Sequence, residues 1–123
     1  MNKHYIDIVG KWAFVLAYDI GWSDTEELAG WLEALGASDE DIDEACELIL
    51  MENKGFTFSN PNLRMSVMCI GDASDIAQWW DTLTHEIDHM QDTILKYYGV
   101  EHGTEDAAWL QGYIMRQIIY ALV

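Results

Sequence analysis

The chain is poor in basic residues, and this scarcity limits the partners that it can bind. It has six Lys and Arg residues against 22 Asp and Glu, which gives a formal net charge of -16. Such a surface repels the phosphates of nucleic acids and the anionic head groups of membranes. We therefore expect neither a nucleic-acid nor a membrane partner, and we expect the chain to attract metal cations and basic proteins.

Long apolar runs are also missing. No run reaches the roughly 18 residues that a membrane-spanning helix needs, and the residues after Met1 lack the apolar stretch of a secretory signal. We therefore expect a cytoplasmic protein. The two cysteines, Cys46 and Cys69, form no Cys-x-x-Cys pair and lie in apolar patterns, so we predict that both are reduced core residues. A disulfide between them stays open as an alternative.

The composition that is present is typical of a globular protein. Half of the 123 residues are hydrophobic, and a chain of this length can bury a core of its own as a single domain over residues 1–123. Three stretches rich in β-branched and aromatic residues predict strands. They are residues 5–18, with a break near Gly10, then 56–59 and 64–70.

Four segments with apolar residues at helical spacing predict helices. The first begins at a capping box of Ser23 and Glu26 and ends at Gly36, and the second begins at Ser38 and stops near residue 53. The third covers residues 75–98 after Ser74 as its cap. A last helix begins near Thr104. Together these segments predict an α+β fold: a small sheet, two acidic helices and two C-terminal helices.

The acidic residues are concentrated in the first two predicted helices. Between Lys11 and Lys54 there are 12 acidic residues and no basic one. The simpler interpretation is a solvated surface on two helices. The alternative is a docking face for a basic protein partner, or a mimic of nucleic acid.

His85-Glu86-Ile87-Asp88-His89 matches the His-Glu-x-x-His pattern. Residues four apart on a helix lie about one turn apart, so both imidazoles project to the same side. Two neutral imidazoles in that arrangement can take two corners of a Zn²⁺ tetrahedron. Glu86 lies about 100° around the helix from His85, where its carboxylate can serve as the general base for a water molecule.

The apolar stripe of this helix supports that placement. We expect it to contain Ile76, Trp80, Leu83, Ile87, Met90 and Ile94. With Ile87 at its centre, His85 and His89 fall about 20° on either side of the opposite pole. The helix can therefore pack by one face and present the histidines on the other.

A catalytic zinc usually has a third protein ligand. Glu105, 16 residues after His89, is our preferred candidate, because its side chain is longer than that of Asp106. Asp106 and His102 stay open as alternatives. An acidic residue in the first turn of a helix is also stabilised by the helix dipole and needs no metal.

Two further residues are candidates for supporting roles. Asp92 can orient a ligating imidazole from behind, and Tyr113 can donate a hydrogen bond to an oxyanion. For Tyr113, a position at the edge of the core is the alternative. We expect Trp79, Trp80 and Trp109 to be core or helix-contact residues.

At these residues the chain resembles zincin metallopeptidases, in particular the gluzincin-like group, and the small metallopeptidases of bacteria and their phages. The similar stretch covers residues 64–119 and includes His85–His89 and Glu105–Ile114. The resemblance implies that His85, His89 and Glu105 bind zinc and that Glu86 is the base. It also implies that the strand at residues 64–70 holds an extended peptide by edge pairing.

The leading hypothesis is therefore a zinc metallopeptidase that hydrolyses a peptide bond of a peptide or protein substrate with a metal-activated water. The second hypothesis is a zincin-like protein without activity, whose acidic helices bind and block a basic partner. A third is metal-assisted hydrolysis of another kind of bond.

Overall fold

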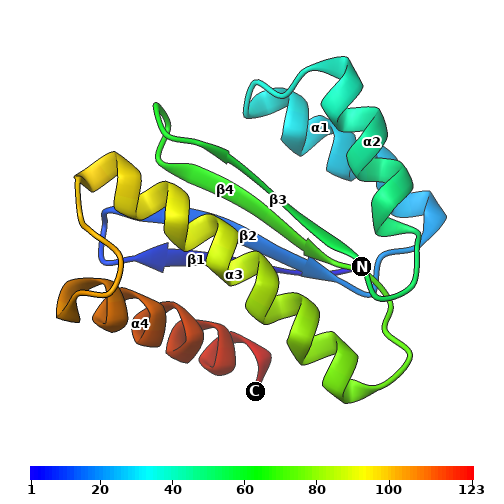
Figure 1. Ribbon diagram of the computed structural model, residues 1–123. Coiled ribbons are helices and arrows are strands. Elements are labelled where there is room, and N and C mark those ends of the chain that lie inside the picture. The colour runs from blue at the N-terminus through cyan, green and yellow to red at the C-terminus, as the bar shows by residue number, and fades with distance from the viewer.

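A computed structural model of residues 1–123 contains one four-stranded sheet with helices on both of its faces (Figure 1). This arrangement confirms the expected α+β class. The elements in chain order are β1 (Asn2–Ile8), β2 (Trp12–Tyr18), a 3-10 turn (Trp22–Asp24), α1 (Thr25–Ala34), α2 (Asp39–Ile49), β3 (Gly55–Asn60), β4 (Met65–Ile70), α3 (Ile76–Tyr98) and α4 (Glu105–Leu122). None of the four α-helices combines the length and apolar character that a bilayer crossing requires.

The strands are ordered β1-β2-β4-β3. β1 and β2 form an antiparallel hairpin, so the single stretch predicted over residues 5–18 is two strands with a turn at Gly10. β2 and β4 pair in parallel, and β3 pairs antiparallel with β4. The parallel pairing requires a long crossover, which here contains α1, α2 and β3.

The strand order overturns one expectation about the substrate strand. β4 has β2 on one side and β3 on the other, so residues 64–70 have no free edge. The prediction that this strand binds an extended peptide by edge pairing is wrong. The free edges belong to β1 and β3, because the crossover from β2 inserts β4 between β2 and β3.

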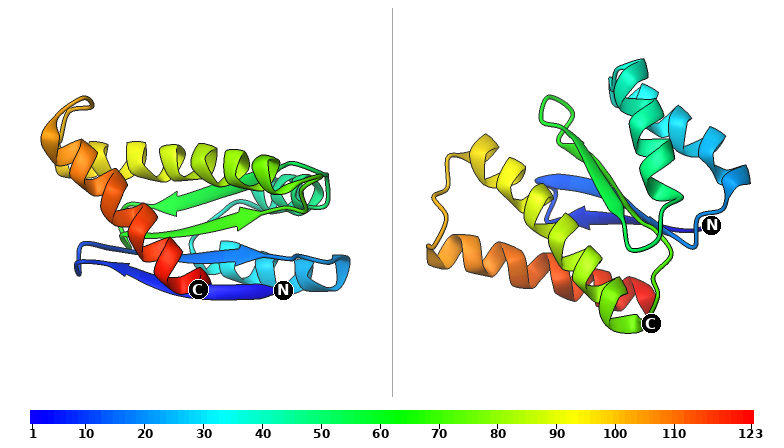
Figure 2. Two further views of the ribbon diagram at one scale, coloured as in Figure 1. Left: turned by 90° about the horizontal axis from the view of Figure 1, so that it is seen from below. Right: turned by 45° about the vertical axis from the view of Figure 1, so that its right-hand side comes forward.

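Alternate strand residues divide the core into two layers. On one face, Phe14, Leu16 and Met68 pack against α3 and α4. α3 lies over β3 and β4 while α4 contacts β1 (Figure 2). On the other face, Ala17, Val67 and Cys69 pack against α1 and α2.

Both cysteines are free, as predicted. Cys69 is fully buried in the layer beneath α1 and α2, and Cys46 is half-buried beside it. Burial, together with the nearby Cys46 and Glu86, raises the pKa of the Cys69 thiol far above its ordinary value. Cys69 therefore stays a neutral thiol inside the sheet.

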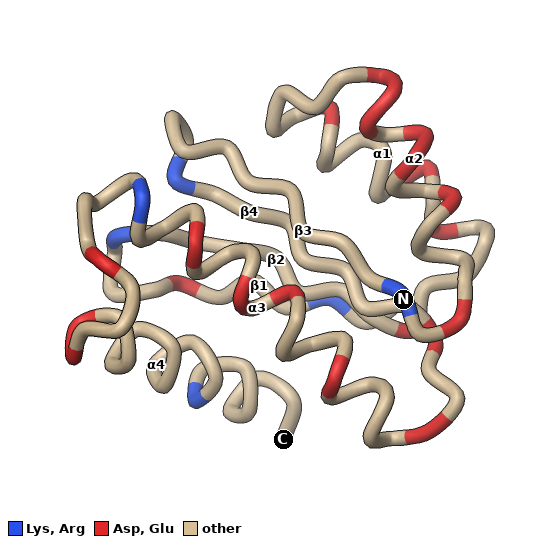
Figure 3. The backbone as a smooth tube through the Cα atoms, viewed as in Figure 1, with Lys and Arg blue, Asp and Glu red and all other residues tan.

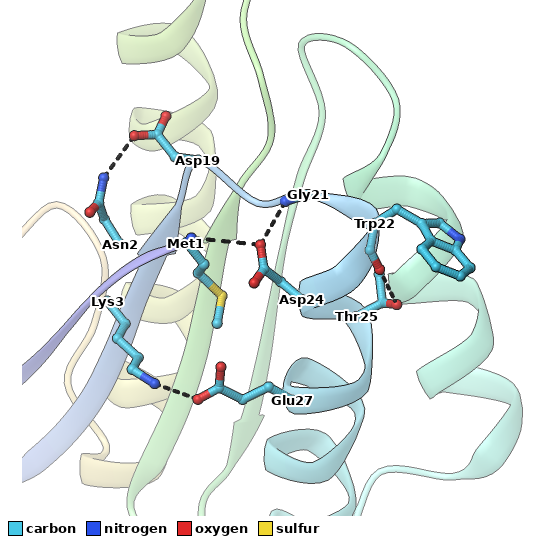
Figure 4. Close-up of polar contacts among 9 residues, drawn as sticks. All are labelled: Met1, Asn2, Lys3, Asp19, Gly21, Trp22, Asp24, Thr25 and Glu27. Carbon is cyan, nitrogen blue, oxygen red and sulfur yellow. Dashed lines mark hydrogen bonds and ion pairs between the residues drawn. The ribbon is translucent and has the colours of Figure 1, made fainter.

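The first residues of β1 are held to the start of α1 by polar contacts (Figure 4). The N-terminal amino group lies 3.6 Å from Asp24 Oδ2, and Lys3 pairs with Glu27. The same Asp24 oxygen accepts a 2.8 Å hydrogen bond from the backbone N–H of Gly21. These contacts hold the N-terminus of the chain against the start of α1.

Two predicted helix caps are wrong. Ser23 and Glu26 form no capping box, because residues 22–24 make a 3-10 turn and α1 begins only at Thr25. Before α3 the cap is Asp75, whose Oδ1 accepts from the backbone N–H of Gln78 at 2.8 Å. Ser74 is engaged with Asn53 across the loop, and a sequence pattern does not reveal that contact.

The predicted apolar stripe of α3 holds from Leu83 onward. Leu83, Ile87, Met90 and Ile94 are buried, but Ile76 is 71% exposed. Ile76 stands at the first residue of α3. Trp79 packs against the core, as predicted. Trp80 is 38% exposed, so its predicted place in the apolar stripe is wrong.

The corner between α3 and α4 forms as predicted. Gly99 has φ +69°, a left-handed conformation that glycine adopts without strain and that ends α3. Thr104 caps α4 by accepting a hydrogen bond from the backbone N–H of Ala107. The corner folds α4 back against α3 and β1.

Candidate functional site

His85 and His89 lie one turn apart on the exposed face of α3. Their Nε2 atoms are 3.0 Å apart and their ring planes are nearly perpendicular, at 88°. Ile87, between them in sequence, is buried on the opposite side of the helix. The predicted convergence of the two rings on one exposed side is thus confirmed.

The distance between the two nitrogens fits two corners of a zinc tetrahedron. Zinc–nitrogen bonds of about 2.0–2.1 Å at the tetrahedral angle put two ligand nitrogens about 3.3–3.4 Å apart. The observed 3.0 Å is close to this spacing and also lets the two rings share a hydrogen bond. The pair can therefore hold a divalent cation after a shift of a few tenths of an ångström.

Glu86 lies between this helix face and the sheet and is only 4% exposed. Its Oε1 accepts a hydrogen bond of 2.8 Å from the hydroxyl of Thr57 on β3. No buried side-chain oxygen or nitrogen lacks a hydrogen-bond partner, so the other carboxylate oxygen, which has no protein partner, keeps contact with solvent. Thr57 thus fixes one oxygen of Glu86 and leaves the second available.

Close packing of α3 on β3 explains how Glu86 reaches the strand. A Cβ atom added at Gly55 would lie 2.7 Å from the carbonyl oxygen of Cys69 and 2.9 Å from Thr82 Cγ2. It would also lie 3.3 Å from Cγ of Glu86. Only glycine fits at the start of β3, and the close approach that it permits sets Glu86 against Thr57.

The histidines and Glu86 share a surface depression of about 550 Å³ with the outer strand of the sheet. The depression extends from α2 across β3 to α3. Its lining residues are Leu48, Gly55, Phe56, Thr57, Ser59, His85, Glu86, His89, Asp92 and Thr93. Because β3 pairs only with β4, the backbone groups on its other side have no strand partner. An unpaired strand edge therefore lies next to the histidine pair.

The structure brings two of the three predicted zinc ligands together. Glu105 lies in the first turn of α4 and lines a separate, smaller depression with Asp88 and His102. No group of three or more His, Cys, Asp or Glu side chains is positioned to hold a metal ion. Asp106, the alternative ligand, lines an apolar cavity that also includes Trp109.

A contact between the helices explains the position of Glu105. The side-chain amide of Gln91 donates a 3.1 Å hydrogen bond to the carbonyl of Ala107 in α4. On a helical wheel, Gln91 lies about 140° from the direction midway between His85 and His89. The first turn of α4 is therefore anchored to the side of α3 and not to its histidine face.

Asp92 lines the same depression as His89, but its partners differ from those expected. Its Oδ1 accepts a hydrogen bond of 2.7 Å from His102, and Lys96 lies 3.9 Å from Oδ2. The hydrogen bond from His102, helped by the positive charge of Lys96, holds the pKa of Asp92 below its ordinary value. Asp92 thus ties the loop before α4 to α3, and it makes no hydrogen bond to His85 or His89.

Tyr113 does not line the depression. Its ring stacks on Trp109, with centroids 5.1 Å apart, and the guanidinium group of Arg116 lies 5.7 Å from the ring centre. Trp109 is itself 56% exposed, so the expectation of a core position for it is wrong. Tyr113 is partly buried and packs against the core, which is the edge-of-core position named as its alternative.

Thr57 is the site residue that the sequence interpretation missed. The alternation in β3 contained a signal, because Phe56 and Phe58 pack toward α1 and α2 while Thr57 bonds to Glu86 on the other face. A polar residue on the inner face of a strand, opposite a buried carboxylate, is typical of a positioning contact.

Replacing Thr57 with Val should weaken the site without changing its shape. Valine has nearly the same volume but cannot donate a hydrogen bond, so Oε1 of Glu86 is left buried without its partner. We expect a loss of about 1–3 kcal/mol in the free energy of unfolding, measured by urea titration. Thr84→Val, the same change at an exposed position of α3 whose hydroxyl bonds only to the backbone of its own helix, is the control. Equal losses in the two variants would contradict the role of Thr57.

Comparisons of the chain with protein-family models, curated proteins and solved structures gave no match. The geometry of the site is thus the basis for any functional conclusion.

Proposed function

We propose that the protein is a zinc-dependent metallopeptidase of a single small domain. One observation carries this proposal: His85, His89 and the free side of Glu86 share one depression with the unpaired edge of β3. A metal-binding pair, a general base and a strand that can hold an extended peptide are the parts that peptide hydrolysis by metal-activated water requires.

In this proposal His85 and His89 would hold the metal through their Nε2 atoms. A zinc ion bound there would supply a Lewis acid that lowers the pKa of a coordinated water and polarises the scissile carbonyl. Glu86 accepts the proton of the attacking water on its free oxygen and returns it to the leaving amine. Thr57 keeps the carboxylate in position by donating to the other oxygen.

We retain Glu105 as the proposed third ligand over Asp92. Asp92 is already committed to His102 and Lys96, whereas Glu105 has no hydrogen bond or ion pair through its side chain. Binding of Glu105 to the same ion would require the first turn of α4 to move from the side of α3 toward the histidine pair.

The test of the proposal is zinc content together with peptide hydrolysis. Protein purified without chelator should retain or take up one zinc per chain, measured by elemental analysis. Cleavage of an unstructured peptide mixture, followed by mass spectrometry, should stop on treatment with a chelator and return with added zinc. Protein that takes up zinc and never cleaves a peptide would contradict the proposal.

A second candidate is a zincin-like protein without activity that binds a basic partner. The observation that favours it is the lack of a third metal ligand beside the two histidines. The acidic residues of α1 and α2 would then form the working surface. Binding to a cationic protein that weakens with salt and is unchanged by Glu86→Gln, in a protein without peptidase activity, would favour this candidate.

A further inference from the structure

We infer that the substrate of this site is a basic peptide, held in extended form along β3 with Lys or Arg side chains directed at α2. The inference rests on the proposed function for the cleavage step. The binding step is independent of that function, because it depends only on the strand edge and the charges beside it.

The free edge of β3 is the first observation. Every residue of β3 pairs with β4 on one side, from Gly55 to Asn60, and no strand pairs on the other. The backbone N–H and C=O groups on that side can therefore accept an added strand. The depression that follows this edge also contains the histidine pair, so an added strand would pass over His85 and His89.

A second depression continues the first one toward α2. It has a volume of about 390 Å³ and shares Leu48 and Phe56 with the depression at the histidines. Three carboxylates of α2 line it: Asp41, Glu44 and Glu47. None of them takes part in an ion pair, although the molecule has other ion pairs at its N-terminus and near Asp92.

The negative charge of the residues that line the two depressions favours a basic peptide. No Lys or Arg residue lines either of them, and the histidine depression adds the buried carboxylate of Glu86. Glu86 is more than nine-tenths buried, it lines the histidine depression, and one of its carboxylate oxygens has no hydrogen bond to a protein group. The acidic residues along α2 are visible in Figure 3. An acidic peptide would be repelled here, and a basic one attracted.

The spacing of the carboxylates also fits an extended chain. Residues two apart in a strand lie about 6.6–6.8 Å apart on one face. Asp41 and Glu47 are six residues apart on α2, a rise of about 9 Å along the helix, with Glu44 between them. Two Lys side chains on the α2 side of a bound strand can thus reach these three carboxylates.

The experiment uses fluorescent peptides of about ten residues, a length that covers the edge strand. They share one sequence except that alternate residues are Lys, Gln or Glu. Binding is measured by fluorescence anisotropy on zinc-supplied Glu86→Gln protein, so that cleavage does not interfere. We expect the Lys peptide to bind about 3- to 10-fold more tightly than the Gln peptide, with the Glu peptide weakest, since partly exposed ion pairs contribute modestly.

A matched pair of triple variants, each built on the Glu86→Gln background, identifies the surface. Asp41→Asn, Glu44→Gln and Glu47→Gln together should bring the Lys and Gln peptides to equal affinity. The control is Asp39→Asn, Glu40→Gln and Asp43→Asn, which removes the same charge from α2 outside the depression. The control should keep the preference. The inference would be overturned if both triple variants lost the preference for the Lys peptide equally, or if the Glu86→Gln protein bound the Lys and Gln peptides with equal affinity.

The two proposals fail in different ways. Suppose that the protein with Glu86 intact cleaves all three peptides at equal rates and shows no binding preference. The inference of a basic substrate would then be rejected, while the proposed peptidase activity would stand. Preferential binding of the Lys peptide without cleavage would keep the docking site and reject the peptidase.

Discussion

Replacing Glu86 with Gln should leave zinc binding intact and remove hydrolysis. The amide oxygen of glutamine can still accept the hydroxyl of Thr57, so the fold around the site is kept. An amide cannot take a proton from water, and loss of a general base lowers kcat by about 10²- to 10⁴-fold. The measurement is the rate of peptide cleavage at saturating zinc, together with zinc content by elemental analysis.

Stability provides a second readout for the same variant. Glu86 is a carboxylate at 4% exposure with one hydrogen bond and no basic side chain paired with it. Burying such a charge is unfavourable, so the neutral amide should unfold at an equal or higher temperature. Glu101→Gln, in the exposed loop before α4, is the control for net charge. A Glu86→Gln protein that is folded, zinc-loaded and fully active would reject Glu86 as the base.

Replacing His89 with Ala should weaken zinc binding by roughly 100-fold or more. The substitution removes one of two nitrogen donors whose Nε2 atoms are 3.0 Å apart, and the remaining imidazole alone holds zinc poorly. The measurement is a competition titration against a chromophoric chelator. Because His89 is exposed, its removal should leave the thermal stability of the metal-free protein nearly unchanged.

His4→Ala is the matched control for this titration. His4 lies on β1, where its ring stacks on Tyr18, and it should contribute nothing to zinc binding at the pair. An equal effect of His4→Ala and His89→Ala on zinc affinity would show that binding is unspecific. Glu105→Gln in the same titration tests the proposed third ligand, and an unchanged affinity would remove Glu105 from the set.

The histidine face was predictable because it depends only on local geometry. The four-residue spacing of His85 and His89, and the position of Ile87 between them, fix where the rings point once the segment is helical. Strand stretches, helix limits and the tight corner at Gly99 follow from local patterns in the same way, to within a few residues. The predicted cap of α3 was wrong because Ser74 hydrogen-bonds Asn53, a residue distant in sequence.

The substrate strand was not predictable, because its place in the sheet depends on distant pairings. The apolar stretch at residues 64–70 has the same local character whether it is central or at an edge. Its central position arises from parallel pairing with β2 across the whole crossover. The contact between Thr57 and Glu86 depends in turn on the position of β3 at the edge and on the absence of a side chain at Gly55.

The separate depression that Glu105 lines could not be predicted for a related reason. Sequence patterns predict that α4 folds back, but not which side of α3 its first turn meets. The hydrogen bond from Gln91 to Ala107 fixes which side of α3 the first turn of α4 contacts. The spacing between His89 and Glu105 does not indicate that side.

The buried, neutral thiol of Cys69 can be used to measure how often the sheet separates from α1 and α2. Cys69 has no exposed surface, and its raised pKa leaves almost no reactive thiolate at neutral pH. A thiol reagent can therefore modify it only in molecules whose central strands have separated from α1 and α2. The rate of labelling at Cys69, compared with that at the half-buried Cys46, measures how often the sheet opens and whether an occupied edge on β3 slows that opening.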